Sequence, residues 1–242
     1  MINRKAEKIF ALYRTLMSMY GPQGWWPLMG EEGIEYHVGR YDYPRNRLEV
    51  FEICIGAILT QNTTFLSVVK SLQNLKAIDA LSPEGVSALD SETFREAIRP
   101  SGYFNQKAKY ILAFIDFFME LGEEIPGREA LLGVLGIGEE TADSILLYAY
   151  KQEEFVIDAY TRRILHVLGY IGEKASYGKI KEMMEEALEL MIGERSRVIV
   201  YQEFHALIVQ HAKQFYTKKP YGARCPVANR RPDSSEEVFG NP

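Results

Sequence analysis

The stretch "LGIGEETADSILLYAYKQEEFVIDAY", residues 135–160, decides the fold of this chain. It sets Gly-Ile-Gly between two apolar helical runs and places a single aspartate, Asp158, twenty residues after the second glycine, Gly138. Two glycines separated by one residue permit a tight turn with positive φ and leave backbone N–H groups bare. Such N–H groups, with the N-terminus of the next helix, can seat a phosphate. A plain corner between two helices would explain the glycines equally well.

Helical periodicity continues on both sides of this stretch. Apolar residues recur at the spacing of one helix face, and alternating strand patterns are rare, so we expect an all-α protein. The segment that begins "GPQGWWPLMGEEG" is expected to be irregular to about residue 47, and the tail from Lys218 reads as a loop. Helices are expected near residue 9, at 49–60, 65–75, 91–100, 105–121 and 128–134, after the glycines, from Asp158, and at 177–192 and 197–216.

Composition excludes several classes of protein. The chain has 242 residues, 47% of them hydrophobic, which suits one large or two small folded domains rather than disorder. A net charge of −5 argues against binding nucleic acid by bulk charge alone. Two cysteines cannot build a disulfide framework. No apolar run reaches the roughly 18 residues of a membrane span, and the N-terminus lacks a signal-peptide pattern, so we expect a cytoplasmic protein.

Asp158 allows two interpretations from its surroundings. As the residue before "AYTRRILHVLGY" it is a suitable N-cap, which needs no further function, yet one carboxylate can both cap a helix and take part in chemistry. Arg162 and Arg163 follow one turn later, where they could hold a phosphate backbone or be solvated. The four histidines do not form a metal-ligand spacing, and His205 and His211 are interpreted as structural.

The stretch resembles the helix-hairpin-helix DNA glycosylases, the superfamily of endonuclease III. The signature of that family is Leu-x-Gly-[Val/Ile]-Gly-x-x-Thr-Ala, with a catalytic aspartate twenty residues after the second glycine, and this chain matches it from Leu135 to Asp158. "ILTQNTT", "IRPSGYFNQKAKYI" and "FHALIVQHAKQFYTKKPYGARC" resemble further family segments in the same order. The resemblance covers roughly residues 50 to 225.

The resemblance implies an architecture and roles for named residues. It implies two helical domains with a cleft between them, one formed by residues 48–152 and the other by 1–47 plus 153–242. The backbone of Gly136 and Gly138 would grip DNA phosphates, and the hairpin carbonyls could bind a monovalent cation. Gln61 would fill the gap left by a flipped nucleotide, and Asp158 would stabilise the oxocarbenium ion and activate water.

Two departures from the family pattern shape the expected activity. Bifunctional members carry a lysine two residues after the second hairpin glycine, where this chain has Glu140, and a carboxylate cannot form a Schiff base. Members with an iron–sulfur cluster use four cysteines near the C-terminus, where this chain has only Cys225, and Tyr216 stands at about the place of the first. We therefore expect no lyase activity, no iron–sulfur cluster and no other cofactor.

Within the superfamily, the chain looks most like the 3-methyladenine DNA glycosylase III group. An N-alkylated purine is cationic, and electron-rich rings attract it by about 0.5–2 kcal/mol per contact. Trp25 and Trp26 are the main candidates for its pocket, with Tyr36, Tyr41 and Tyr43 as weaker ones. Each tryptophan could equally serve as a staple that closes the N-terminal segment over the core.

The sequence therefore predicts a monofunctional DNA glycosylase of base excision repair that acts on alkylated purines. Its expected partner is double-stranded DNA with a damaged base, and the protein is expected to be a nucleoid-associated monomer. Three alternatives stay open. The same fold could act on mismatched thymine, uracil or an oxidised base, it could cleave the strand through another amine, or it could bind DNA without catalysis.

Overall fold

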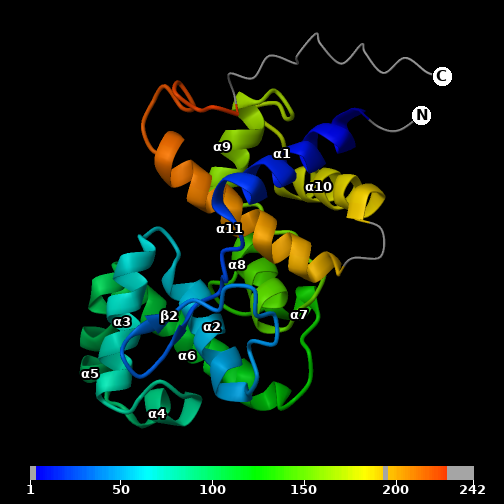
Figure 1. Cartoon of the computed structure of the whole chain (residues 1–242). Helices are drawn as coiled ribbons and strands as arrows, with labels where there is room; N and C mark the ends of the chain where they lie inside the picture. Colours follow the sequence, from blue (N-terminus) through cyan, green and yellow to red (C-terminus); the bar gives the residue numbers. More distant parts are fainter. Residues whose placement is uncertain (1–3, 193–195, 228–242) are drawn as a thin grey trace, which may run out of the picture. The chain divides into compact units, whose positions relative to one another are not determined.

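The computed structural model describes residues 4–192 and 196–227, most of them helical (Figure 1). The helices before the hairpin are α1 (Arg4–Tyr20), α2 (Arg47–Leu59), α3 (Phe65–Ala77), α4 (Pro83–Ala88), α5 (Ser91–Ile98), η1 (Arg99–Ser101), α6 (Phe104–Leu121) and α7 (Arg128–Leu132). Those after it are α8 (Glu139–Ser144), the π-helical turn η2 (Ile145–Ala149), α9 (Ala159–Val167), α10 (Tyr177–Ile192) and α11 (Arg197–Phe215).

The all-α fold class is confirmed, with two additions. The segment expected to be irregular contains two antiparallel strands of two residues each, β1 (Leu28–Met29) and β2 (Ile34–Glu35). Leu28 lies opposite Glu35. The short helix α4 was not expected from the sequence. No helix in residues 4–192 and 196–227 is long and apolar enough to cross a membrane.

Polar side chains define where several helices begin. Each accepts a hydrogen bond from a backbone N–H of the first turn, which would otherwise lack a partner inside the helix. The residues that cap a helix in this way are Asn46 for α2, Thr64 for α3, Ser82 for α4, Asp90 for α5 and Asp158 for α9.

The chain divides into two compact units, and the division falls within α11. Unit 1 comprises residues 1–21, 157–193 and 204–242, and unit 2 comprises 22–156 and 194–203. Residues 1–3, 193–195 and 228–242 lie outside the described part of the chain. The boundaries expected from the sequence, 48–152 against 1–47 plus 153–242, differ from this division at residues 22–47, 153–156 and 194–203.

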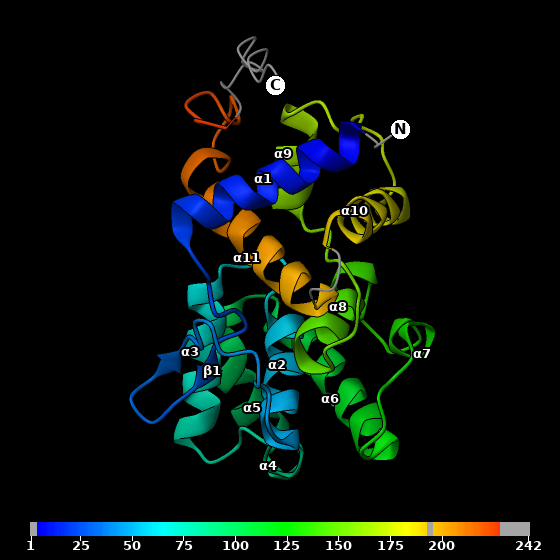
Figure 2. The same cartoon turned by 45° about the vertical axis from the view of Figure 1, so that its right-hand side comes forward.

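Unit 2 is built around α2, which is labelled in Figure 2. Its residues from Phe51 to Leu59 are buried. A helix that is apolar on every side is covered on every side, and α3, α6, α8, η2 and β1 all contact it. The buried Glu52 accepts the Met29 N–H at 2.6 Å, and burial raises the pKa of this carboxyl to about 7. These contacts hold residues 22–47 on α2, which explains why they group with this unit.

Unit 1 is formed by segments from both ends of the chain. The apolar face expected on the first helix is buried at Ile9, Leu12 and Leu16, and α1 packs against α10. His211 of α11 is fully buried, and its two ring nitrogens face the Tyr20 hydroxyl at 2.8 Å and the Cys225 sulfur at 3.1 Å. The end of α1, the end of α11 and the segment after it therefore meet at one histidine.

Candidate functional site

Two of the three glycines in the turn between α7 and α8, Gly136 and Gly138, have different roles. Gly136 has a φ of +84°, and a Cβ at this position would lie 2.2 Å from the ring of Tyr110. Only glycine fits there. Gly138 precedes α8 in ordinary extended backbone, with φ −97° and ψ 179°, and nothing lies within 4 Å of where its Cβ would be. Positive φ is therefore a property of Gly136 alone in this turn.

The amides of this turn are available to a ligand. The N–H groups of Gly136 and Gly138 meet no acceptor within the part of the chain that the structure describes, and Gly138 is exposed. Exposed amides at the start of a helix favour an anion. The geometry is thus compatible with the expected phosphate contact.

Gln61 lies against this turn within the same unit. It follows the C-cap Thr60 of α2, and its Nε2 donates to the Gly136 carbonyl at 2.9 Å and to the Thr141 hydroxyl at 3.1 Å. The structure therefore brings together Gln61, Gly136 and Gly138, three residues that the sequence assigned to DNA binding.

The backbone carbonyls of the hairpin are the groups that would bind the expected monovalent cation. The carbonyl of Val134 accepts the Ile137 N–H at 3.1 Å, and that of Gly136 accepts from Gln61. Each of these oxygens keeps a second lone pair, so both could still serve as ligands to a cation.

A buried ion pair joins the helices on either side of the turn. Arg128 of α7 contacts Asp143 of α8 through two hydrogen bonds, at 2.7 and 3.2 Å, and the Asp143 side chain is fully buried. The Arg128 guanidinium also lies 3.7 Å from Glu139. Glu140, at the position of the family lysine, is exposed in the first turn of α8.

Asp158 caps α9 in unit 1, as the sequence indicated. Its Oδ1 accepts the Thr161 N–H at 2.7 Å. Its Oδ2 lies 3.8 Å from Nε2 of His205, a residue that the sequence reading treated as merely structural. The sequence did not predict this approach, because α11 brings His205 to Asp158 only in three dimensions and no local pattern marks the pair.

Arg162 and Arg163 are both engaged inside unit 1. Arg162 donates to the Ala175 carbonyl at 2.8 Å, and Arg163 donates to the Tyr216 carbonyl at 3.3 Å. The Arg163 guanidinium also lies 4.9 Å from the centre of the Tyr221 ring. Each guanidinium has five N–H donors, so a phosphate contact would be additional to these bonds.

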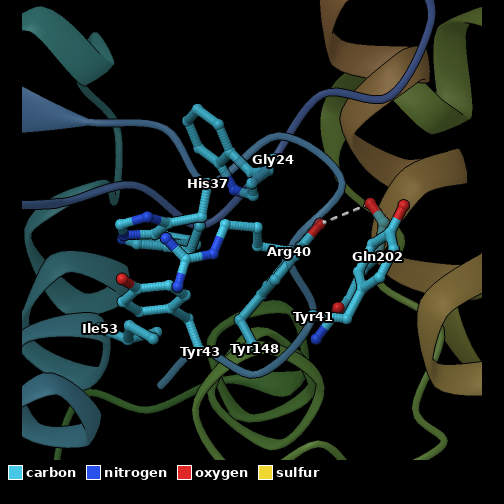
Figure 3. Close-up of a pocket in the computed structure, with 10 residues that line it drawn as sticks. Gly24, His37, Arg40, Tyr41, Tyr43, Ile53, Tyr148 and Gln202 are labelled. Carbon is cyan, nitrogen blue, oxygen red and sulfur yellow. Dashed lines mark hydrogen bonds between the residues drawn. The ribbon is translucent and has the colours of Figure 1, made fainter. Parts of the chain in front are cut away.

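Trp25 and Trp26 line one pocket of unit 2, whose eight other lining residues are labelled in Figure 3. Trp26 is buried against α2 beside Gly56, whereas Trp25 is half-buried and packs on Phe65 with ring centres 4.5 Å apart. The staple role is thus clearest for Trp26. The other residues that line the pocket are Gly24, His37, Arg40, Tyr41, Tyr43, Ile53, Tyr148 and Gln202.

This pocket is closed in the structure. Its volume is about 20 Å³, which holds about one water molecule and no purine. His37 stacks on Tyr43 with ring centres 3.5 Å apart and planes at 4°, and the Arg45 guanidinium lies 4.1 Å from the same Tyr43 ring. On the other side, the Tyr148 hydroxyl donates to the Gln202 carbonyl at 3.2 Å (Figure 3). A purine base does not fit the pocket in this arrangement of its lining residues.

A second, more open pocket of about 300 Å³ lies beside Gln61. Tyr103 lines it with a side chain that is 68% exposed and a φ of +47°. Lys107, also in its lining, is buried, and its ammonium donates to the carbonyls of Leu59 and Ser101, both at 2.7 Å. Lys107 therefore ties the last residue of α2, two positions before Gln61, to the last residue of η1. Tyr103 and Lys107 lie in "IRPSGYFNQKAKYI", a segment that resembles the family, but the sequence assigned neither of them a role.

The C-terminal segment contains a compact polar cluster at the place where the resemblance would put an iron–sulfur cluster. Tyr216 and Cys225 are fully buried, and Cys225 contacts His211 as described above. The chain has only two cysteines, and Cys54 is buried in α2 of the other unit. Within the described residues, no group of three His, Cys, Asp or Glu side chains could hold a metal ion. The donor set therefore does not fit a four-cysteine cluster.

Comparison with known proteins places these features in a family. A family model described as HhH-GPD superfamily base excision DNA repair protein matches residues 55–190. The chain is 38% identical over 238 residues to MJ1434 of Methanocaldococcus jannaschii, to which a DNA repair glycosylase activity is attributed, covering 94% of this chain and 97% of that protein. It is 30% identical over 184 residues to endonuclease III of Sulfolobus acidocaldarius, covering 74% and 79% of the two chains.

A solved structure shows the same fold. The crystal structure of H. pylori 3-methyladenine DNA glycosylase (MagIII) bound to 1,N6-ethenoadenine matches with a TM-score of 0.66 and 29% identity, covering 87% of this chain and 97% of that one. The expected resemblance to the 3-methyladenine DNA glycosylase III group is thereby confirmed. With the match of the family model over more than half of its length, the chain belongs to the HhH-GPD superfamily of base excision DNA repair proteins.

Proposed function

We propose that this protein is a monofunctional DNA glycosylase that releases N-alkylated purines from double-stranded DNA. The observation that carries the proposal is the carboxylate of Asp158, held at the start of α9 by the Thr161 N–H at 2.7 Å. This bond fixes one carboxylate oxygen and leaves Oδ2 for chemistry. The membership of the family and the likeness to MagIII support the choice of reaction.

The hairpin and Gln61 would hold the DNA. The bare amides of Gly136 and Gly138 would bind phosphates next to the lesion, and Arg162 and Arg163 would add contacts from unit 1. Gln61 would leave the Gly136 carbonyl and fill the gap in the duplex once the nucleotide has flipped.

Asp158 would perform the hydrolysis. As the bond between C1′ and the base nitrogen breaks, its electron pair leaves with the base, and a positive charge develops on the sugar. The carboxylate stabilises that charge and takes a proton from the water whose oxygen bonds to C1′. The products are a free base and an abasic site.

Absence of strand cleavage follows from Glu140. Its carboxylate stands where bifunctional relatives carry the lysine that attacks the sugar, and it has no amine with which to form an imine. Lys107 is a poor substitute, since its ammonium is buried and bonded to two backbone carbonyls. We also propose that the enzyme works without a cofactor, because two cysteines cannot ligate an iron–sulfur cluster.

The preference for alkylated purines is supported by the aromatic lining of the pocket with Trp25 and Trp26. A positively charged purine is already a good leaving group, so binding by stacked rings supplies most of what the enzyme must add. The pocket must open for this, because in the present structure His37 stacks on Tyr43.

A neutral base, such as mismatched thymine, uracil or an oxidised purine, is the second candidate. Within the described residues, Trp26 Nε1 and His37 Nε2 are buried without a hydrogen-bond partner, and both residues line the pocket. Buried polar atoms without a partner favour a base whose edge carries hydrogen-bonding groups that can pair with them. This observation supports a neutral substrate more than a cationic one.

The test measures base release from duplexes that carry 3-methyladenine, 7-methylguanine, uracil, a G·T mismatch or 8-oxoguanine. Release of alkylated bases that is lost in Asp158→Asn, with strand breaks only after alkali, is the expected result. Release of a neutral base alone would support the second candidate. A covalent adduct trapped by borohydride would contradict the monofunctional mechanism, and DNA binding without any release would indicate a non-catalytic binder.

A further inference from the structure

His205 lies beside the carboxylate that the reaction needs. Both residues belong to unit 1, with Asp158 at the start of α9 and His205 in α11. The distance from His205 Nε2 to Asp158 Oδ2 is 3.8 Å, and the two side chains are only 9% and 13% exposed. Bulk water therefore screens this pair weakly, so a charge on the imidazole would act strongly on the carboxylate.

The two oxygens of Asp158 have separate surroundings. Oδ1 is used by the Thr161 N–H, whereas Oδ2 faces the imidazole. Oδ2 accepts no hydrogen bond from the residues that the structure describes, and 3.8 Å is longer than a hydrogen bond to His205 would be. Oδ2 is thus the oxygen on which the sugar and water would depend, and His205 is the titratable group that faces it.

The charge of His205 depends on pH. Burial lowers the pKa of this imidazole below its ordinary value, and the negative charge of Asp158 opposes that shift only in part. On the same helix, Glu203 accepts from the Gln23 N–H and the Tyr41 hydroxyl, and His211 contacts Tyr20 and Cys225. His205 is therefore neutral near pH 7 and gains its proton in acid, next to Asp158.

We propose that His205 is a positioning residue that sets the acid limit of base excision. The neutral imidazole leaves the charge of Oδ2 available to the sugar, whereas the protonated imidazole pairs with Oδ2 and withdraws that charge from the oxocarbenium ion. The loss of activity in acid then reports the protonation of His205. This inference rests on the proposed function, because it assigns a role to the neighbour of the proposed catalytic carboxylate.

The experiment compares single-turnover base release by wild type and His205→Asn across the acid range, on whichever damaged duplex the wild type processes fastest. One pH unit below its apparent pKa, the wild type should keep about a tenth of its plateau rate. The His205→Asn variant, normalised to its own rate at neutral pH, should keep most of its plateau there. His166→Asn is the matched control, because His166 is exposed on α9, and it should retain the wild-type profile.

A titration by NMR tests the same pair without catalysis. The pKa of His205 should fall when Asp158 is changed to Asn, because the carboxylate no longer favours the charged imidazole. Unchanged His205 titration in Asp158→Asn, or an acid limb that persists in His205→Asn, would overturn the inference while base excision by the wild type stands. A wild type that releases no base from any duplex would instead overturn the proposed function, and the inference with it.

Discussion

Gly136 and Gly138 offer a matched pair of substitutions at the residue scale. Gly136→Ala would force an L-residue to a φ of +84° and push a methyl group into the ring of Tyr110, so we expect a loss of about 1–3 kcal/mol in the free energy of unfolding. Gly138→Ala has an allowed backbone and open space, and its free energy of unfolding should change by less than about 0.5 kcal/mol. Urea unfolding measures both.

DNA affinity separates the two glycines further. If a phosphate approaches the backbone at Gly138, the added methyl group of Gly138→Ala should weaken binding to a duplex although the protein stays folded. Fluorescence anisotropy with an abasic duplex measures this. Wild-type affinity in Gly138→Ala would mean that the phosphate does not come close to this residue.

Glu140→Lys tests the account of the missing lyase activity. The exposed position in the first turn of α8 would then carry the amine that bifunctional relatives place there, and we expect a covalent adduct with an abasic duplex after borohydride treatment. Glu140→Gln is the control, because it removes the charge without supplying an amine, and it should give no adduct. If Glu140→Lys also gives none, the side chain at 140 does not reach the sugar.

At the scale of elements, the ion pair between Arg128 and Asp143 fixes α7 against α8 and so shapes the hairpin. Arg128→Met would leave a buried carboxylate without its guanidinium, and we expect the free energy of unfolding to fall by about 3–5 kcal/mol. The double variant Arg128→Met/Asp143→Leu removes both charges and should recover much of this loss. Tryptophan fluorescence in urea is suitable, because both tryptophans belong to the same unit as the pair. Equal losses in the single and the double variant would show that the pair itself, not the unpaired charge, stabilises the hairpin.

Local sequence pattern predicts helices well but not how they end. The run after Gly138 was expected as one helix with an inward stripe, and Ala142, Ile145 and Leu146 are indeed buried. Its last turn is nevertheless π-helical. The side-chain amide of Gln202 donates to the Leu147 carbonyl at 2.9 Å, and a side chain inserted in this way is a usual cause of such a turn. Because Gln202 comes from α11, no pattern within residues 139–149 could reveal it.

For the whole molecule, the spacing of residues within one stretch predicted local structure, but contacts between distant stretches could not be predicted from the sequence. The capping role of Asp158 followed from its place before a helical run, and the approach of Gln61 to the hairpin agrees with the resemblance. The hydrogen bond from the Met29 N–H to Glu52 joins residues 22–47 to α2, and His205 approaches Asp158 from another helix. Such contacts are set by packing, which sequence periodicity does not encode.

His211 makes the stability of unit 1 depend on pH. It is fully buried between Tyr20 and Cys225, and burial lowers its pKa to about 4. The unfolded chain, with a histidine pKa of about 6.5, therefore binds a proton between these values that the folded protein does not. The contribution of His211 is complete above about pH 6.5 and is lost as the pH falls towards 4, by about 3 kcal/mol in all.

Urea unfolding at several pH values tests this contribution. The free energy of unfolding of wild type should fall between pH 6.5 and 4 more steeply than that of His211→Gln, which cannot take up the proton, whereas exposed His166→Gln should follow the wild type. Both tryptophans lie in unit 2, so their fluorescence reports that unit, while circular dichroism reports every helix. If the chain unfolds as a whole, the two signals should show the same dependence on pH. A dependence seen by circular dichroism alone would mean that unit 1 unfolds by itself, and equal slopes in wild type and His211→Gln would contradict a neutral, buried His211.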